Sequence, residues 1–488
     1  MTRASDEVPN LLSQATIERA RQFDRAELVL PRGMWKSIRE YLFRDPSKEY
    51  ACYLLCGQCV VSRTLRLLGC FLVLPEEEDY ESHSLTGVRL SRRLLIEVLT
   101  ECERHSLSLI DIHSHPFASD TVFFSGTDDA DEKEKADWFL RHLPHAFYGS
   151  VVLAKNCHRA RLRTADRSIS EVDLDTRSLD LPLVVRRDRN LNARRAPLGA
   201  MVDRHVRAFG RDGQERLRAA RISIVGVGGL GSGLAIGLAQ LGVTHFTLID
   251  PDRADLTNLN RVHGMTAADA KLGSKKVEVT ARAILQINPK VKLRLLEESI
   301  LHERAWSSLL TSDLIIAATD NHASRMLLNA FSQVYLIPQV SVGALIESKD
   351  NEILGGYGHV FVMLPGHSQQ CLLCSQIINP VEAYYETASE AHRDEAARRG
   401  YINNADVPAP AVVHLNGVLQ NLALVEIHNL FCGFKEPARY LLYDLLEQEL
   451  LHVVDDGPQC AVCSPGGGFF GRGARSLVRN LFREFGSQ

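Results

Sequence analysis

The sequence predicts an α/β protein with more than one domain, and three observations support this prediction. A chain of 488 residues exceeds what one hydrophobic core usually organises, so two or three domains are expected. Residues 222–342 alternate short apolar stretches with helical patterns, as a parallel sheet with helices on both faces requires. Residues 26–165 mix short apolar runs and helical stretches in a different order.

The composition is typical of a soluble globular protein, with 45% hydrophobic and 24% charged residues. The formal net charge of −4 gives no reason to expect a nucleic-acid or membrane partner. The first residues lack the apolar core of a signal peptide, and no run of about 18 apolar residues occurs. We therefore expect a cytoplasmic protein, in which the 11 cysteines are thiols or metal ligands rather than disulfides.

The N-terminal elements follow from periodicity. Residues 27–43 predict a strand and an amphipathic helix, and residues 50–61 predict a strand. Residues 91–105 predict a helix, and residues 107–115 predict a strand that ends at Pro116. Both element types therefore occur in this first domain.

Changes in composition set the domain boundaries. Residues 186–200 are basic and close with proline and glycine, so we place a linker at 166–200, between domains at 26–165 and 201–465. Residues 466–488 form a glycine-rich tail with a short amphipathic helix. The predicted strands of the second domain are 222–227, 245–250, 313–320 and 335–342.

A glycine-rich turn follows the first of these strands and opens a helix. Gly226, Gly228 and Gly231 have the G-x-G-x-x-G spacing, which permits a tight turn and presents helix N-terminal amides to a phosphate. Asp250 ends the next strand, where a carboxylate can bind ribose hydroxyls. Taken alone, this fingerprint would indicate an NAD-dependent dehydrogenase.

The residues that follow favour triphosphate chemistry over hydride transfer. Asn258, Arg261 and Lys276 supply polar and cationic groups. Asp320 ends a strand, where open α/β sheets hold their ligands. Cations that converge on a phosphate, with a carboxylate that can hold Mg²⁺, suit ATP better than NAD. Each residue alone could instead face solvent or cap a helix, so the argument rests on the combination.

The order of these motifs resembles that of the ThiF/MoeB-type adenylyltransferases, which include ubiquitin-activating enzymes. The resemblance covers residues 200–465 and rests on "ISIVGVGGLGS", "DPDRADLTNLNR", "GSKK" and "AATDN". It implies a Rossmann-like doubly wound fold and ATP-dependent adenylation of the C-terminal glycine of a ubiquitin-like protein. By this resemblance Gly226, Gly228, Gly229 and Gly231 cradle the nucleotide, Asp250 binds ribose, Asn258, Arg261 and Lys276 contact the phosphates, and Asp320 supports Mg²⁺ and the α-phosphate.

The same resemblance implies a homodimer. Arg204 resembles the family arginine that reaches ATP from the partner subunit, and Arg207 is the alternative. A ubiquitin-like or sulfur-carrier protein that ends in glycine is the expected partner. A conjugating enzyme would be a further partner if the modifier is passed on to target proteins.

Two C-x-x-C pairs lie in the second domain. Cys371 and Cys374, with Cys460 and Cys463, suit tetrahedral zinc without an open position, which is typical of a structural site; separate redox motifs are the alternative. The family has the same tetrathiolate. Members that form a thioester carry another cysteine after the first pair, but none lies between Cys374 and Cys432. Cys432 closes a helix, where a buried inert thiol is the favoured interpretation, so thioester transfer is in doubt.

Two histidines in the first domain form a candidate metal site. His113 and His115 are two residues apart on a predicted strand, so their side chains point to the same face. Ser125 and Asp128 follow. Two imidazoles and one carboxylate leave a fourth zinc position open for water, as in catalytic sites. Glu49 is the candidate base for that water.

This pattern of a glutamate, H-x-H-P and S-x-x-D resembles the JAMM/MPN zinc metalloproteases, an α/β fold, over residues 26–165. The resemblance implies that His113, His115 and Asp128 bind zinc, Glu49 is the general acid/base and Ser125 helps to hold the oxyanion. In one departure, twelve residues separate the second histidine from the aspartate, where the family has ten. Asp129 and, less strongly, Asp120 are therefore alternative ligands, and a metal-free scaffold is the alternative interpretation of the domain.

Together, the two domains predict a bifunctional enzyme that acts on a ubiquitin-like protein. The first would cleave beyond the terminal glycine, for precursor maturation or deconjugation, and the second would adenylate that glycine. The expected cofactors are ATP, Mg²⁺, one catalytic zinc and one structural zinc. Activation of a sulfur carrier for thiocarboxylate formation is the close alternative, and a non-catalytic scaffold that binds a ubiquitin-like tail is a further one.

Overall fold

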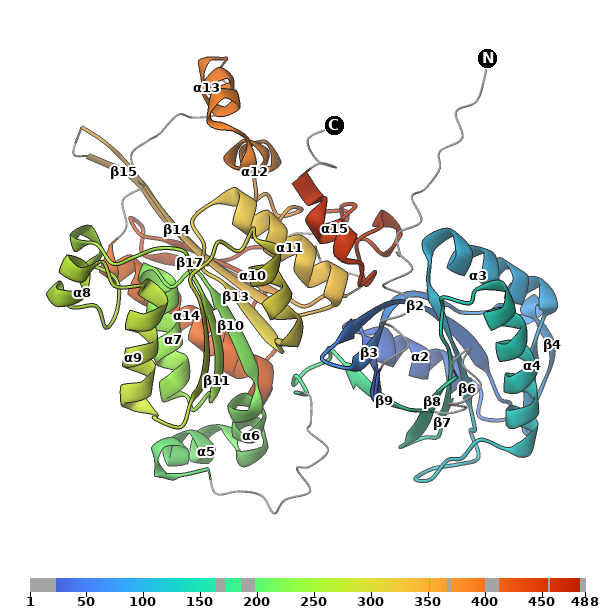
Figure 1. Cartoon of the computed structure of the whole chain (residues 1–488). Coiled ribbons are helices and arrows are strands. Elements are labelled where there is room, and N and C mark those ends of the chain that lie inside the picture. Colours follow the sequence, from blue (N-terminus) through green and yellow to red (C-terminus); the bar gives the residue numbers. More distant parts are fainter. Residues whose placement is uncertain are drawn as a thin grey trace, which may run out of the picture. The chain divides into compact units, whose positions relative to one another are not determined.

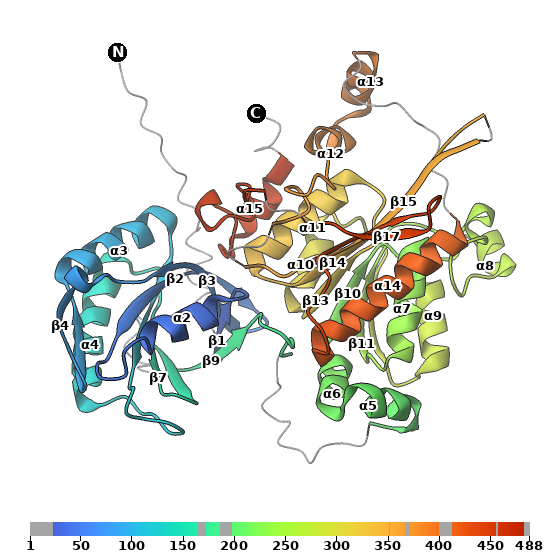
Figure 2. The same cartoon turned by 180° about the vertical axis from the view of Figure 1, so that it is seen from behind.

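The computed structural model of the chain describes residues 23–163, 172–185, 198–350, 352–366, 370–399, 412–454 and 457–482. It divides into two compact units (Figures 1 and 2). The first contains the chain up to Ser178 and the short segments Val334–Leu336 and Gly468–Leu477, and the second contains the remainder. Residues 166–171 and 186–197 of the expected linker, and 483–488 of the expected tail, lie outside the described ranges.

The first unit contains a closed barrel with the strand order β1-β3-β2-β6-β7-β8-β9. Its strands are β1 (Arg25–Leu30), β2 (Ala51–Val61), β3 (Thr64–Val73), β6 (Ser108–Ser114), β7 (Tyr148–Leu153), β8 (His158–Arg163) and β9 (Val172–Ser178). β9 lies within the stretch that the sequence assigned to the linker. It pairs in parallel with β1, although its mostly polar sequence gives little sign of a strand.

Both faces of β2 and β6 are covered. In these strands even-numbered side chains such as Cys52 and Ile110 pack with α2 (Met34–Leu42). Odd-numbered side chains such as Tyr53 and Leu109 pack with α3 (Arg92–His105) and α4 (Gly126–His142). A small hairpin, β4 (Tyr80–Ser84) and β5 (Gly87–Leu90), precedes α3. Odd-numbered residues at the strand ends therefore lie on the face that α4 covers.

The second unit contains a sheet of order β12-β11-β10-β13-β14-β15-β16-β17. The first five of these strands are parallel, as the alternation predicts, and the last three form an antiparallel extension that it did not predict. The strands are β10 (Arg221–Val225), β11 (His245–Ile249), β12 (Lys292–Leu296), β13 (Leu314–Ala317), β14 (Gln339–Lys349), β15 (Glu352–Met363), β16 (Tyr440–Asp444) and β17 (Glu449–His452).

One predicted strand begins later than expected. Tyr335 is the last residue of α11 (His322–Tyr335), so the strand predicted at 335–342 was placed too early. Pro338 lacks an N–H group, and β14 begins directly after it at Gln339. The apolar residues before the proline are buried at the helix end and resemble a strand in composition alone.

Helices cover both faces of this sheet (Figures 1 and 2). α7 (Gly229–Gln240) and α14 (Val413–Cys432) run side by side in the same direction, because Gly229, Gly233 and Gly237 of α7 face successive turns of α14. The other helices are α5 (Asp203–Phe209), α6 (Arg211–Ala219), α8 (Ala267–Leu272), α9 (Lys276–Ile287), α10 (Glu303–Ser308), α12 (Pro380–Thr387), α13 (Glu390–Arg398) and α15 (Arg475–Arg479). None of the helices among the described residues could cross a membrane.

Candidate functional sites

The glycine-rich turn joins β10 to α7. Gly226 has a φ of +84°, a conformation that favours glycine, and its amide donates to the Ile249 carbonyl at 2.9 Å. A Cβ on Gly231 would lie 1.8 Å from the Gly226 carbonyl oxygen, whereas a Cβ on Gly228 would meet nothing within 4 Å. The turn itself therefore requires Gly226 and Gly231, and Gly228 leaves open space beside the helix N-terminus.

Asp250 connects the end of β11 to this turn. One carboxylate oxygen accepts from the Val227 amide at 2.7 Å, and the other accepts from the Asp252 amide at 2.8 Å. Burial raises the pKa of Asp250, while these hydrogen bonds and Lys276 partly lower it. Each oxygen has a second lone pair, so the carboxylate can also accept a hydrogen bond from a ribose hydroxyl.

Two cations approach the turn from different elements. Lys276 is the first residue of α9, is 9% exposed, and has its Nζ 2.7 Å from an oxygen of Asp252. Arg261 flanks the start of α7, because a Cβ on Gly229 would lie 3.3 Å from the Arg261 Cγ and Cδ atoms. One guanidinium nitrogen of Arg261 donates to the Thr257 carbonyl at 2.7 Å. The structure thus places Arg261 beside the glycine turn and Lys276 beside the segment after β11 that contacts this turn.

Asn258 and Asp320 complete this edge of the sheet. Asn258 is buried, and its carbonyl accepts from the Arg261 amide at 3.1 Å. Asp320 is exposed and follows β13. The end of β13 contacts the turn, since the Ala318 amide donates to the Val225 carbonyl at 2.9 Å.

Arg204 lies at the other end of α7 in its own chain. It is exposed on α5, directly before α6. Gln214 of α6 donates to the carbonyl of Leu241, which follows the last turn of α7, at 2.6 Å. Arg207, the alternative, pairs with Asp203 at 2.7 Å. The chain alone therefore does not bring either arginine to the glycine turn.

α14 supplies polar residues that the sequence analysis missed. Gln420 donates to the Gly229 carbonyl at 2.8 Å, and its Nε2 lies 3.4 Å from the His263 Nε2. Asn416, one turn earlier, is buried and borders Gly229. Polar residues at i and i+4 on one face of a largely apolar helix were the available signal, although the helix carries other polar residues as well. No motif connects them to a turn that lies 191 residues away in the sequence.

Cys432 lies at the opposite end of α14. A Cβ on Gly213 of α6 would lie 2.6 Å from its sulfur, so the thiol packs against that helix. Burial raises the pKa of Cys432, and Arg216 partly lowers it. Asn416 and Cys432 are separated by about 24 Å along the helix. The thiol is therefore far from the glycine turn.

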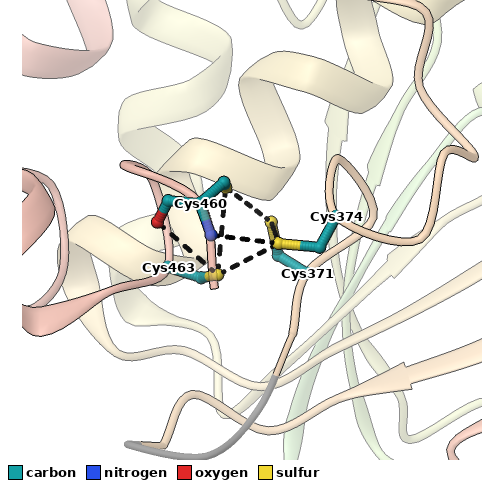
Figure 3. Close-up of side chains that lie close together, drawn as sticks. All are labelled: Cys371, Cys374, Cys460 and Cys463. Carbon is teal, nitrogen blue, oxygen red and sulfur yellow. Dashed lines mark hydrogen bonds between the residues drawn. The ribbon is translucent and has the colours of Figure 1, made fainter. Parts of the chain in front are cut away.

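The four C-x-x-C cysteines converge in the second unit (Figure 3). Sulfurs held at about 2.3 Å by one zinc lie about 3.8 Å apart at the corners of a tetrahedron, whereas a disulfide needs about 2.05 Å. The thiols are free and fit a zinc ion with no open position. The Sγ–Sγ distances are 3.8 Å for Cys371–Cys374, 3.6 Å for Cys371–Cys460, 3.4 Å for Cys374–Cys463 and 3.9 Å for Cys460–Cys463.

Two N–H groups point at these sulfurs. The Asn329 side chain donates to the Cys371 sulfur at 3.4 Å, and the Cys460 amide donates to the Cys374 sulfur at 3.3 Å. Such bonds favour the thiolate form that binds metal. The Leu372 amide in turn donates to the Asn329 oxygen at 3.0 Å. Because Asn329 belongs to α11, the cluster is attached to that helix.

β6 and α4 bring together three candidate ligands in the first unit. The ligand atoms of His113, His115 and Asp128 all lie within 4.8 Å of one another. The Nε2 atoms of His113 and His115 are 3.5 Å and 3.4 Å from the two Asp128 carboxylate oxygens. Ligand atoms about 2.0 Å from one zinc lie about 3.3 Å apart. The His113 Nε2 is buried without a hydrogen-bond partner among the described residues, so these residues fit zinc with an open fourth position.

The two alternative carboxylates point elsewhere. Asp129 lies 2.7 Å from a guanidinium nitrogen of Arg161, and Asp120 accepts from the Asn156 side chain at 2.8 Å. Asp128 alone of the three contacts the histidines among the contacts of the described residues. The extra two residues of the loop therefore do not displace this carboxylate.

Ser125 places Asp128 by capping α4. The Ser125 hydroxyl accepts from the Asp128 amide at 3.1 Å, and the Ser125 amide donates to the Asp128 carboxylate at 2.6 Å. This reciprocal pair is a capping box, which fixes the first turn of the helix. The hydroxyl proton of Ser125 is not used in these two bonds.

Glu49 lies opposite His115. The antiparallel register pairs Ala51 of β2 with His113 of β6, so Glu49 and His115 face each other two residues further on. Glu49 is 3% exposed, and its carboxylate lies 3.8 Å from the His115 Nε2. Burial raises the pKa of Glu49 to about 7, although His115 and His113 partly lower it. Such a carboxyl group can accept and release a proton near neutral pH.

Known proteins resemble the C-terminal half of the chain. The model of the ThiF family matches residues 202–463. Molybdopterin-synthase adenylyltransferase of Escherichia coli is 31% identical over 264 residues, which cover 53% of this chain and 92% of that protein. Sulfur carrier protein ThiS adenylyltransferase of E. coli is 28% identical, over 48% of this chain and 81% of that protein. Ubiquitin-like modifier-activating enzyme 5 of Drosophila willistoni is 27% identical, over 50% and 58%.

Proposed function

Because the chain belongs to the ThiF family, we propose that its C-terminal half adenylates the C-terminal glycine of a ubiquitin-like or sulfur-carrier protein. The observation that carries this proposal is the arrangement around the open helix N-terminus beside Gly228: Asp250 binds the glycine turn, Arg261 flanks Gly229, and Lys276 contacts Asp252 next to Asp250. The relatives support the class of acceptor, since one is named for a sulfur carrier and another for ubiquitin-like modifiers.

In this reaction a carboxylate oxygen of the acceptor forms a bond to the α-phosphorus of ATP. The bond from that phosphorus to its bridging oxygen breaks, and pyrophosphate leaves. Amides at the start of α7 would receive the phosphates, and Arg261 and Lys276 would offset the charge that moves onto pyrophosphate. Asp250 would hold the ribose. Asp320 would hold Mg²⁺, which supplies further charge neutralisation.

A second copy of the chain would supply Arg204. We propose a homodimer in which Arg204 of the partner subunit reaches ATP, as the family resemblance implies. The position of α5 at the far end of α7 supports a source outside the same chain. Arg204→Ala should then lower the adenylation rate without changing the thermal stability of the protein.

Pyrophosphate release with MgATP and a ubiquitin-like protein that ends in glycine tests the adenylation. Lys276→Ala should lower the rate about 100-fold or more, because a cation is lost where charge develops. Lys275→Ala is the matched control, since its side chain is 35% exposed and pairs with Glu297, whereas that of Lys276 is 11% exposed and pairs with Asp252 next to Asp250. If no acceptor of this kind supports pyrophosphate release, the proposal fails.

Intact-mass spectrometry of the same reaction separates adenylation from thioester transfer. We expect pyrophosphate without a covalent adduct on this chain, because Cys432 lies against α6, far from the glycine turn. An adduct that reducing agent removes and that Cys432→Ala lacks would contradict this expectation. Its absence favours delivery of the adenylate to another nucleophile, with sulfur the first candidate.

For the N-terminal half, we propose a zinc peptidase that cleaves beyond the glycine of the same ubiquitin-like protein, for maturation or deconjugation. The close approach of His113, His115 and Asp128, with Glu49 opposite His115, supports this proposal. The three ligands would hold zinc, which supplies Lewis-acid activation of water and of the scissile carbonyl. Glu49 would take the proton of the attacking water and return it to the leaving amine.

Zinc content and cleavage of a ubiquitin-like precursor test this second proposal. Asp128→Asn should lose one zinc ion per chain and the cleavage activity, because the amide is a poor ligand for zinc. Asp129→Asn is the matched control on the same helix turn, since Asp129 pairs with Arg161 instead. Equal zinc content and activity in the two variants would contradict the assignment of Asp128.

A further inference from the structure

The first turn of α11 is held by side chains from two segments. α11 begins directly after Asp320 and Asn321. The Glu386 carboxylate, from α12, accepts from the amides of His322 at 3.2 Å and Ala323 at 2.6 Å. The Asn321 side chain accepts from the next amide, that of Ser324, at 2.8 Å. Amides that usually lack a partner at a helix N-terminus are therefore satisfied here.

The contact between the two helices is reciprocal. The His322 Nδ1 accepts from the Asn379 amide at 3.1 Å, so the ring proton lies on Nε2, which faces the Glu382 carboxylate at 3.1 Å. Asn379 is also the cap of α12, because its side chain accepts from the amides of Val381 and Glu382. Each helix therefore holds the N-terminus of the other.

Arg325 lies one turn further along α11, and its guanidinium lies against β14, since a Cβ on Gly343 would be 2.9 Å from one of its nitrogens. Burial lowers the pKa of Arg325, while Asp320 and Glu386 both raise it. Its Nε is buried without a hydrogen-bond partner among the described residues. The charge of Arg325 is therefore felt by both the Asp320 and the Glu386 carboxylates.

The same helix is attached to the cysteine cluster. Asn329, two turns after His322, donates to the Cys371 sulfur. α12 follows Cys374 closely in the sequence, so the segment between the cluster and Glu386 is short. α11 is therefore fixed at its start by Glu386 and two turns later by the cluster, which leaves the Asp320 turn little freedom.

We propose that Glu386 is a positioning residue for adenylation, which keeps the Asp320 carboxylate available for Mg²⁺. The inference rests on the proposed nucleotide function, and it gives Glu386 no contact with ATP or with the acceptor. Loss of the Glu386 charge would remove the anion that holds the amides at the α11 N-terminus, directly after Asp320, and those amides would then compete with Mg²⁺ for the Asp320 carboxylate. Asp320 would then bind Mg²⁺ more weakly.

The test is ATP binding by the full chain at increasing Mg²⁺ concentrations. Glu386→Gln should raise the Mg²⁺ concentration for half-maximal binding about threefold to tenfold. ATP affinity at saturating Mg²⁺ and zinc content should stay at wild-type values, and thermal stability should fall only slightly, by the loss of the helix-capping charge. Glu390→Gln, on the neighbouring helix α13, is the matched control and should behave like wild type.

Two further results are decisive. If Glu386→Gln and wild type share the same Mg²⁺ dependence, the positioning role is wrong, while ATP binding by both leaves the nucleotide function intact. If wild type binds no ATP at any Mg²⁺ concentration, the nucleotide function itself fails. If the Glu386→Gln protein loses its zinc, Glu382→Gln is the variant to test instead. It weakens the contact between α12 and the His322 ring but leaves Glu386 as the cap of α11. It should give a smaller shift in the same direction, and no shift would overturn the inference.

Discussion

At the scale of single residues, two glycines of the same turn should respond differently to one added methyl group. In Gly231→Ala the new Cβ would lie 1.8 Å from the Gly226 carbonyl oxygen, which belongs to the backbone and cannot rotate away. We expect the free energy of unfolding to fall by about 1–3 kcal/mol. Denaturant unfolding measures this change.

Gly228→Ala is the matched variant. Its Cβ would meet nothing within 4 Å, so only its ψ of −147°, which is unusual for a residue with a side chain, opposes the substitution, and stability should fall by about 1 kcal/mol. ATP affinity should fall about tenfold, because the methyl group enters space proposed for phosphate. If Gly228→Ala instead lowered stability strongly and left ATP affinity unchanged, Gly228 would have the structural role and not the role of leaving space for phosphate.

Residues in local motifs could be predicted from the sequence, and residues joined only by the fold could not. The glycine turn and the cysteine pairs have spacings that carry their own geometry. Gln420 and Glu386 act through contacts with amides or carbonyls of distant segments, and backbone groups leave no trace in the sequence. Spacing alone could not separate Asp128 from Asp129; the helix cap does.

At the scale of elements, α4 docks on the barrel through buried charges. The Lys135 ammonium lies 3.0 Å from Asp111 of β6 and 2.7 Å from Asp131. The Tyr148 hydroxyl also donates to Asp111, at 3.1 Å. Burial lowers the pKa of Lys135, but the nearby carboxylates raise it above its ordinary value overall, so the ammonium stays charged.

Lys135→Met should therefore destabilise the first unit. It leaves Asp111 and Asp131 partly buried without their cation, and we expect a loss of about 3 kcal/mol in the free energy of unfolding. Lys133→Met, on the exposed face of the same helix, should change it by less than about 0.5 kcal/mol. Equal denaturation midpoints for the two variants would show that this ion cluster does not hold α4.

Element types followed from periodicity more reliably than element ends. The apolar run before Pro338 has strand composition, yet α11 extends into it as far as Tyr335, because burial at a helix end and burial in a strand select the same residues. β9 carries few apolar residues, so only its pairing with β1, far away in the sequence, identifies it. β15–β17 extend the sheet by antiparallel pairing, which the βα alternation does not encode.

At the scale of the whole molecule, the two metal clusters belong to different units and should bind zinc independently. We expect two zinc ions per chain by elemental analysis. Replacing Cys371 and Cys374 by serine should remove one ion, and replacing His113 and His115 by alanine should remove the other. Cys432→Ser should keep both, and the joint loss of both ions in either double variant would contradict independence.

The loss of zinc from the cysteine cluster and the loss of zinc from the histidine site should differ in their effect on thermal stability. The cysteine cluster joins segments 89 residues apart, and a cross-link that closes such a loop contributes about 4.6 kcal/mol in the chain-entropy model. Loss of that zinc should lower the midpoint of thermal unfolding of the second unit. Loss of the His113–His115 zinc should leave that transition unchanged, because those ligands lie on elements already held by the barrel and the capped helix.

The capping of α4 also determines how such sites can be found in other sequences. Asp128 moves with the start of its helix, and the number of residues in the preceding loop does not enter the geometry of the cap. Each doubling of loop length costs only about 0.6 kcal/mol in closure entropy, so evolution can insert or delete loop residues while the ligand stays in place. A search pattern that counts from the second histidine will therefore overlook relatives with longer loops. One that treats the histidine pair and the serine–aspartate step as two separate anchors will retain them.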